Sequence, residues 1–271
     1  MIPVSLTGFT GYFIYSPHIS LKIICVSFGI FLLAVSASAL NQIQEVDLDS
    51  RMNRTQNRPI PSHNINLNEA LIFFMANLIA GMAIIYSMGN PKAMIIGLIT
   101  ILWYNGIYTY LKRITAFAVV PGAVTGALAP LIGWIAAGGG LWDKPILFLE
   151  FLLFTGQIPH FWLLLLKYGE EYKKAGIPSL TGVFEHPQIN RLTFTWVVSS
   201  SIAALFLCYF EIIKSRLVIV ILLIASAVLI WQFSALIKTK AYEKSYTKYS
   251  LLLEMYFLLI LLLLISDKVI G

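Results

Sequence analysis

Long apolar segments recur along the whole chain and limit its fold more than any other feature. Each has roughly 18 residues or more with few charges, enough for a helix to cross the ~30 Å hydrocarbon core of a bilayer. Because lipid cannot satisfy backbone hydrogen bonds, such segments span as helices. We expect spans at about 20–40, 68–88, 93–111, 115–137, 145–167, 193–213, 217–238 and 250–266. A short additional span at 1–15 brings the expected number to about nine.

Composition supports this assignment. Only 12% of the residues are charged and the mean hydropathy is +0.81, whereas soluble domains average about 25% charged residues. The predicted fold is therefore all-α, a polytopic membrane helical bundle that forms a single transmembrane domain over residues 1–271. Cys25 and Cys208 lie alone in apolar segments, which indicates neither a disulfide nor a cysteine metal site.

The basic residues give an orientation. Thirteen of the 19 Lys and Arg residues fall in connections on one face, at 41–67, 112–113, 167–192 and 238–248. By the positive-inside rule this face is cytoplasmic. We therefore expect an integral protein of the bacterial inner membrane. The net charge of +6 belongs to these loops and indicates no nucleic-acid partner.

The segment 37–62 is unusually polar for its place at the end of a membrane span. If the helix of that span continues past Leu40, Asn41, Glu45 and Asp49 share one face at i, i+4 and i+8, while Asp47 points elsewhere. Two carboxylates and an amide oxygen suit a hard cation such as Mg²⁺, which proteins usually hold with one or two carboxylates plus substrate phosphates.

Arginines follow these acids at once. Arg51, Arg54 and Arg58 can make bidentate contacts to phosphate, and together with a metal they describe a diphosphate site. The alternative is a solvated loop whose acids and arginines pair with one another. The acids and arginines cluster at the cytoplasmic ends of spans, which favours a site there.

Four motifs show a resemblance to a known family. "NQIQEVDLDSRMNRTQNRPIPS" (41–62) resembles the first aspartate-rich motif of UbiA-type intramembrane prenyltransferases. It is most similar to that of the protoheme IX farnesyltransferases, or heme O synthases. "YTYLKRITAFAVVPGAVTGALAPLIGWIAAGG" (108–139), "GQIPHFWLLLL" (156–166) and "EEYKKAGIPSL" (170–180) resemble further blocks of the same family, in the same order.

The resemblance implies a reaction and its partners. Members of this family transfer a farnesyl group from farnesyl diphosphate to a vinyl group of heme b, with addition of water, to make heme O. It implies Mg²⁺ as cofactor, and farnesyl diphosphate, heme b and the lipid bilayer as partners. Heme-copper oxidase assembly proteins are a further suggested partner. The active site is expected on the cytoplasmic side.

The resemblance also assigns roles to single residues. Those expected to hold Mg²⁺ are Asn41, Glu45 and Asp49, with Asp47 as an additional ligand. Those expected to bind the diphosphate are Arg54, Arg58, Lys112 and Arg113. We expect Asn41, Glu45, Asp49, Lys112 and Arg113 to be the catalytic set.

The chain departs from the superfamily pattern at two places. Glu45 stands where the family has Asp, which keeps the charge and adds a methylene. The second motif of the superfamily, D-x3-D, is absent, and Glu170 and Glu171 are the acidic residues that stand there. Either glutamate is a candidate ligand for a second Mg²⁺, and the sequence does not choose between them. We expect His160, an ionisable residue within an apolar span, and Tyr172 to line the heme pocket.

Other functions stay open from the sequence. A prenyltransferase acting on an aromatic quinone precursor would share the first motif, but would normally carry the second D-x3-D. A membrane transporter would place its acids nearer the bilayer midplane, and an inactive homologue could serve as an assembly factor. Structural roles are expected for Gly122, Gly126 and Gly133, as points of close helix packing. Asn77 and Asn105 are expected to make interhelical hydrogen bonds.

Overall fold

The computed structural model describes residues 1–238 and 243–270, and in these residues it contains helices and no strands. The helices are α1 (Ile2–Tyr15), α2 (Leu21–Gln44), α3 (Val46–Asp49), α4 (Leu67–Ile84), η1 (Ile85–Gly89), α5 (Pro91–Ile101), η2 (Leu102–Tyr108), α6 (Thr109–Leu111), α7 (Val119–Ala137), α8 (Lys144–Lys174), η3 (Leu180–Gly182), α9 (His186–Tyr209), α10 (Arg216–Lys238) and α11 (Glu243–Ile270).

The predicted spans are confirmed. Eight helical segments of the described residues are long and apolar enough to cross a membrane, and they coincide with the eight long spans expected from the sequence. The short segment at 1–15 forms α1, a helix of 14 residues. The chain is thus an integral membrane protein with an all-helical fold. The predicted basic connection at 238–248 includes residues 239–242, which lie outside the described ranges.

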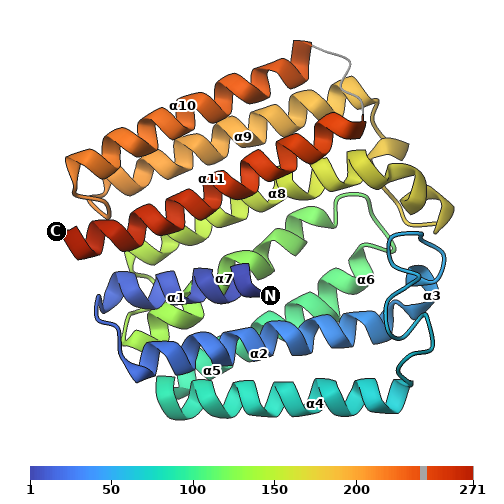
Figure 1. The fold of residues 1–271 in the computed structure, drawn as a ribbon, viewed down its shortest axis with the longest axis horizontal. Helices are drawn as coiled ribbons and strands as arrows, with labels where there is room; N and C mark the ends of the chain where they lie inside the picture. The colour runs from blue at the N-terminus through green and yellow to red at the C-terminus, as the bar shows by residue number, and fades with distance from the viewer. Residues whose placement is uncertain (239–242, 271) are drawn as a thin grey trace.

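The long helices lie side by side in two groups (Figure 1). Helices α1, α2, α4, α5 and α7 form the lower group in this view, and α8 to α11 form the upper one. Contacts between α7 and α8, and between α1 and α11, join the two groups. The ends of α2, α6 and α8 lie at the same edge of the bundle, on the right of the figure, where the charged segment after α2 forms α3 and its loops.

Small residues let α1 and α7 approach closely. A Cβ atom added to Gly133 would lie 1.9 Å from the backbone oxygen of Gly8, which is far inside contact distance. Added Cβ atoms at Gly122 and Gly126 would meet the ring of Tyr108 and the amide of Gln157 at 2.6 and 2.1 Å. The interpretation of these three glycines as packing points is confirmed.

The third membrane-spanning segment changes its helical form midway. Its first part is the α-helix α5, and Leu102–Tyr108 then form the π-helix η2 before α6. π-helical turns are rare and are frequently found at functional sites. Asn105, in η2, donates to the backbone oxygen of Ala37 in α2 at 3.0 Å, as expected for an interhelical bond. For Asn77 the expectation is wrong, because its amide donates to Phe73 O one turn earlier in the same helix.

Candidate active site

A cavity of about 190 Å³ opens at the edge of the bundle where α2, α6 and α8 end. Its apolar wall comes from the segment before α7, from α8 and from the loop after α8. Its polar lining contains six of the residues singled out from the sequence: Asn41, Glu45, Asp49, Arg54, Arg58 and Lys112.

The acidic part of this lining comes from one helical face, as the spacing predicts. Helix α2 ends at Gln44, yet the backbone N–H of Glu45 still donates to Asn41 O at 3.0 Å, and that of Asp49 to Glu45 O at 2.8 Å. The four-residue spacing therefore continues through the junction with α3. Asn41, Glu45 and Asp49 are all buried, with relative exposures of 7%, 4% and 2%.

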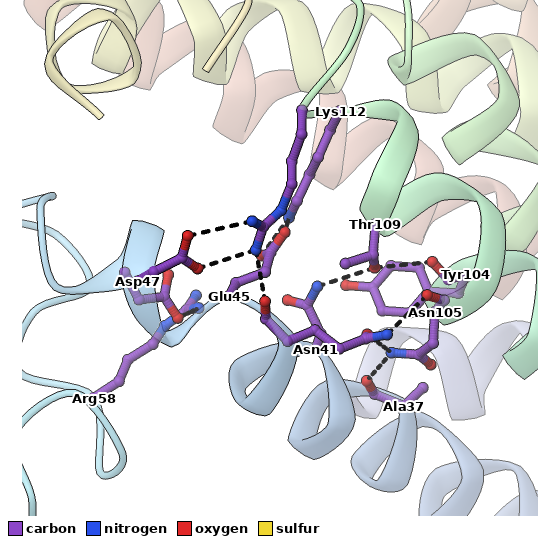
Figure 2. A network of polar contacts seen from close by, with 12 residues as sticks. Ala37, Asn41, Glu45, Asp47, Arg58, Tyr104, Asn105, Thr109 and Lys112 are labelled. Carbon is purple, nitrogen blue, oxygen red and sulfur yellow. Dashed lines mark hydrogen bonds and ion pairs between the residues drawn. The ribbon is translucent and has the colours of Figure 1, made fainter. Parts of the chain in front are cut away.

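Each buried carboxylate has a cationic partner in the same cavity. Arg58 contacts Asp49 through its Nη1 atom, 2.8 Å from Oδ2, and the ammonium group of Lys112 pairs with Glu45 (Figure 2). Buried charges need such partners, because removing one of them leaves an uncompensated charge at a cost of about 3–5 kcal/mol. Each of the two buried carboxylates therefore forms an ion pair with a partly exposed cation.

Burial also affects the protonation of Lys112. Desolvation, and secondly the positive charge of Arg113, lower the pKa of Lys112 to about 7. An anion that stays beside its ammonium group, such as Glu45 or a bound phosphate, favours the charged form.

The amide of Asn41 is oriented by α6. Its Nδ2 atom donates to Thr109 Oγ1 at 3.2 Å, and that hydroxyl donates to Tyr104 O at 2.9 Å (Figure 2). Because the amide nitrogen is engaged, the amide oxygen is the atom that a cation can use. Gln44, which the sequence did not single out, adds a reciprocal pair with Asn105: its Nε2 donates to Asn105 O at 3.0 Å and its Oε1 accepts from Asn105 Nδ2 at 3.1 Å.

The donor set fits magnesium. Asn41, Glu45 and Asp49 offer one amide oxygen and two carboxylates to the cavity, and Mg²⁺ is usually held by one or two carboxylates together with waters and substrate phosphates. Within the described ranges, no three or more His, Cys, Asp or Glu side chains come together as a metal group. The three donors of Asn41, Glu45 and Asp49 suit an ion that is shared with a phosphate ligand.

Asp47 and Arg113 lie outside this cavity lining. Their side chains pair with each other, Nη2 to Oδ1 at 3.0 Å, and Arg113 also donates to Gln44 O at 2.6 Å. Burial opposes ionisation of Asp47, but the hydrogen bond and charge of Arg113 outweigh it and hold the pKa of Asp47 below its ordinary value. The structure thus separates these two residues from the other predicted ligands, because Asp47 is on a different helical face from Glu45 and Asp49.

The second acidic position lies beside the cavity. Helix α8 has a non-helical residue at Tyr168, with φ −116° and ψ 16°, just before the two glutamates. Glu171 accepts a hydrogen bond from the backbone N–H of Arg54 at 3.1 Å, whereas Glu170 is exposed. Tyr172 lines the cavity itself. The structure thus brings Glu171, and not Glu170, into contact with the loop after α3.

His160 contacts a residue of α11 and does not line the cavity. Its Nδ1 atom lies 3.5 Å from Oε1 of Glu254 in α11, and Ser250 also donates to that oxygen at 3.3 Å. The next residue, Phe161, lines the cavity, and the two rings are 5.8 Å apart. His160 is thus adjacent to the cavity but not part of its lining.

Two functional features were not predicted from the sequence. Tyr104 and Tyr108 line the charged cavity, with ring centroids 5.5 Å apart. A second cavity of about 210 Å³ lies deeper in the bundle and is mostly apolar, with Ile30, Leu33, Ile101 and Ile132 in its wall. The aromatic run "WYNGIYTY" carries part of this signal, but the π-helix that directs its side chains has no clear sequence signature.

Known proteins resemble this chain over most of its length. The sequence profile of the UbiA prenyltransferase family matches residues 4–261. Protoheme IX farnesyltransferase of Oleidesulfovibrio alaskensis is 35% identical over 215 residues, covering 79% of this chain and 76% of the relative. Protoheme IX farnesyltransferase of Geobacter sulfurreducens is 40% identical over 153 residues, covering 56% of each chain.

Solved structures share the fold. A structure of digeranylgeranylglyceryl phosphate synthase superposes with a TM-score of 0.80 at 22% identity, covering 100% of this chain and 94% of the other. A UbiA homologue from Archaeoglobus fulgidus, bound to DMAPP and Mg²⁺, superposes with a TM-score of 0.72 at 15% identity, covering 96% and 95%. With a family profile over nearly its whole length and the same helical fold, the chain belongs to the UbiA prenyltransferase family.

Proposed function

We propose that this prenyltransferase transfers a farnesyl group from farnesyl diphosphate to a vinyl group of heme b, with Mg²⁺, to make heme O. The observation that carries the proposal is the cavity in which buried Asn41, Glu45 and Asp49 face Lys112, Arg54 and Arg58. The choice of heme b as acceptor is supported by relatives at 34–40% identity that are protoheme IX farnesyltransferases.

The reaction breaks the C1–O bond of farnesyl diphosphate, and its electron pair leaves with the diphosphate. The π electrons of the vinyl group form the new C–C bond to C1. Water then adds to the cation left next to the porphyrin ring and releases a proton. Cleavage of the C1–O bond is the step that the protein must stabilise, because negative charge grows on the departing diphosphate.

The cationic residues can stabilise this negative charge. Lys112, Arg54 and Arg58 lie in one cavity, so all three can contact a diphosphate held there. Preorganised charges in a site shielded from water stabilise developing charge far better than charges in water do. When bound at Asn41, Glu45 and Asp49, Mg²⁺ would supply further positive charge to the phosphate oxygens.

The apolar walls can hold the isoprenoid chain of the substrate. Phe161, Leu165 and Val119 line the charged cavity, and the deeper cavity of about 210 Å³ offers apolar space for an isoprenoid chain. An apolar enclosure also keeps water from the allylic cation until the new C–C bond has formed. We place this site on the cytoplasmic side, and His160 and Tyr172 at the heme.

Pigment analysis tests the proposal. Membranes with and without the chain are supplied with heme b, farnesyl diphosphate and Mg²⁺, and hemes are separated by chromatography and mass. We expect a heme that has gained one farnesyl group and one hydroxyl group, and no such product after chelation of Mg²⁺. Prenylation of a quinone precursor instead of heme b by the same membranes would overturn the assignment of the acceptor.

A further inference from the structure

Tyr104 lies between the two cavities. Among the residues that the structure describes, it is the only one in the linings of both the charged cavity and the deeper apolar cavity. The charged cavity holds the cations, and the deeper one is lined mainly by aliphatic and small side chains. A ligand with a charged head and a long apolar tail that occupies both must therefore pass this ring.

The backbone at Tyr104 is held from several sides. It belongs to the π-helix η2, and Thr109 Oγ1 donates to its carbonyl oxygen at 2.9 Å. The residues on either side are also fixed, because Trp103 Nε1 donates to Pro121 O at 2.7 Å and Asn105 Nδ2 to Ala37 O at 3.0 Å. Figure 2 shows the Tyr104 ring reaching from η2 toward Asn41. The backbone that carries the ring is thus fixed, and the ring itself packs against that of Tyr108, 5.5 Å away between centroids.

The neighbouring ring is already engaged by a protein cation. The Nζ atom of Lys112 lies 5.7 Å from the centroid of the Tyr108 ring, within cation–π distance. No such contact with a protein cation is found for Tyr104 within the described part of the chain. Its ring therefore remains available to a cation that belongs to the substrate.

We propose that Tyr104 contacts the first isoprene unit of the prenyl diphosphate, where it stabilises the allylic cation and separates the head cavity from the tail cavity. This inference rests on the proposed prenyl diphosphate site and not on heme b as the acceptor. With the diphosphate among Lys112, Arg54 and Arg58, the carbon that loses the C–O bond lies at the boundary between the cavities. The electron-rich face of the ring opposes the positive charge that develops there.

The proposal makes Tyr104 both a catalytic residue and a selector of chain length. Three substitutions separate these roles: Tyr104→Phe keeps the ring, Tyr104→Leu keeps an apolar wall without a π face, and Tyr104→Ala removes both. In membranes containing the full chain, we expect Tyr104→Phe to stay within about threefold of the parent kcat. We expect Tyr104→Leu and Tyr104→Ala to lose about tenfold or more, with smaller changes in KM.

Chain-length selection is measured without any acceptor. The purified protein with Mg²⁺ is titrated with the S-thiolodiphosphate analogues of geranyl, farnesyl and geranylgeranyl diphosphate. We expect Tyr104→Ala to flatten the parent protein's preference among the three lengths, while Tyr104→Phe and Tyr104→Leu retain it. Tyr110→Ala, which removes an exposed ring six residues after Tyr104, is the control for general disturbance.

Two results would overturn the inference: unchanged kcat and length preference in Tyr104→Ala, or a loss confined to the KM for heme b. If Tyr104→Ala does not fold, Tyr104→Leu still tests the π face, because equal kcat for the Leu and Phe variants would refute its role. If the parent makes no heme O but the analogues bind and their length preference shifts with Tyr104→Ala, the inference stands and only the proposed acceptor fails.

Discussion

Lys112 and Arg113 are adjacent in the chain, yet the structure gives them different surroundings. Lys112 lines the charged cavity and pairs with Glu45, whose side chain is 5% exposed. Arg113 pairs with Asp47 at the surface, where the two side chains are 34% and 48% exposed. The family resemblance assigns both cations to the diphosphate, and the structure places only Lys112 in the cavity lining.

Substituting these two cations should therefore have unequal effects. We expect Lys112→Ala to lower the rate of prenyl transfer by about 100-fold or more, because it removes a cation from the cavity and leaves Glu45 unpaired. We expect Arg113→Ala to stay within about fivefold, since an exposed ion pair contributes only about 0–1 kcal/mol. Rates are compared at equal amounts of protein in the membrane. Equal losses for the two variants would contradict the structural distinction.

His160 permits a second comparison at this scale. Because it lies beside the cavity, next to Phe161, and contacts Glu254, we expect His160→Ala to weaken heme b binding about tenfold while changing the affinity for a farnesyl diphosphate analogue little. Heme titration by absorbance and analogue titration by calorimetry measure the two affinities. Ser250→Ala is the control, because Ser250 donates to the same carboxylate oxygen of Glu254. An equal loss of both affinities would remove His160 from the heme pocket.

At the scale of elements, the contact between α1 and α7 depends on residues without side chains. Alanine at Gly133 would place its Cβ atom 1.9 Å from the Gly8 backbone oxygen, and a backbone cannot move aside as a side chain can. We expect Gly133→Ala to lower the free energy of unfolding by about 1–3 kcal/mol. Thermal melting in detergent measures this change.

Gly106 provides the matched control for this substitution. A Cβ atom added there would meet nothing within 4 Å, so Gly106→Ala should leave the melting temperature close to that of the parent. A parent-like melting temperature for Gly133→Ala would mean that α1 and α7 can move apart without loss of stability, contrary to the packing described above.

The elements differ in how far the sequence predicts them. The eight long helices follow from apolar length alone, because a bilayer leaves few alternatives to a helix. The π-helix η2 does not, since its residue Asn105 and the following Thr109 make tertiary contacts with α2 that the sequence does not show. This irregular element places Tyr104 and Tyr108 in the site, beside the acidic residues of α2 and α3.

For the whole molecule, orientation is the property that the basic loops predict. In a parent chain with Cys25 and Cys208 replaced by serine, single cysteines are placed at Ser50, after α3, and at Trp142, between α7 and α8. These exposed positions mark opposite ends of the bundle. We expect an impermeant thiol reagent added to intact cells to label the Trp142→Cys variant and to label Ser50→Cys only after lysis. Labelling in the reverse order would place the charged cavity on the outer face.

The candidate site was predictable where it depends on spacing along one helix. Asn41, Glu45 and Asp49 share a face because four residues complete about one helical turn, and the structure retains that relation across the end of α2. What spacing cannot supply is the partner from another helix. The pairing of Glu45 with Lys112, the distance of Asp47 and Arg113 from the cavity, and the contact of His160 with Glu254 all depend on how distant segments pack.

The central claim is that the buried carboxylates of the cavity, and not the exposed acid beside them, hold the metal ion that binds the diphosphate. The direct measurement is the Mg²⁺-dependent rate of farnesyl transfer to heme b for Asp49→Asn and Asp47→Asn, in membranes with equal amounts of each protein. Asp49 is 2% exposed in the cavity, whereas Asp47 lies outside the lining. We expect Asp49→Asn to lose about 100-fold or more and Asp47→Asn to stay within about fivefold. An Asp49→Asn protein as active as the parent would contradict the account.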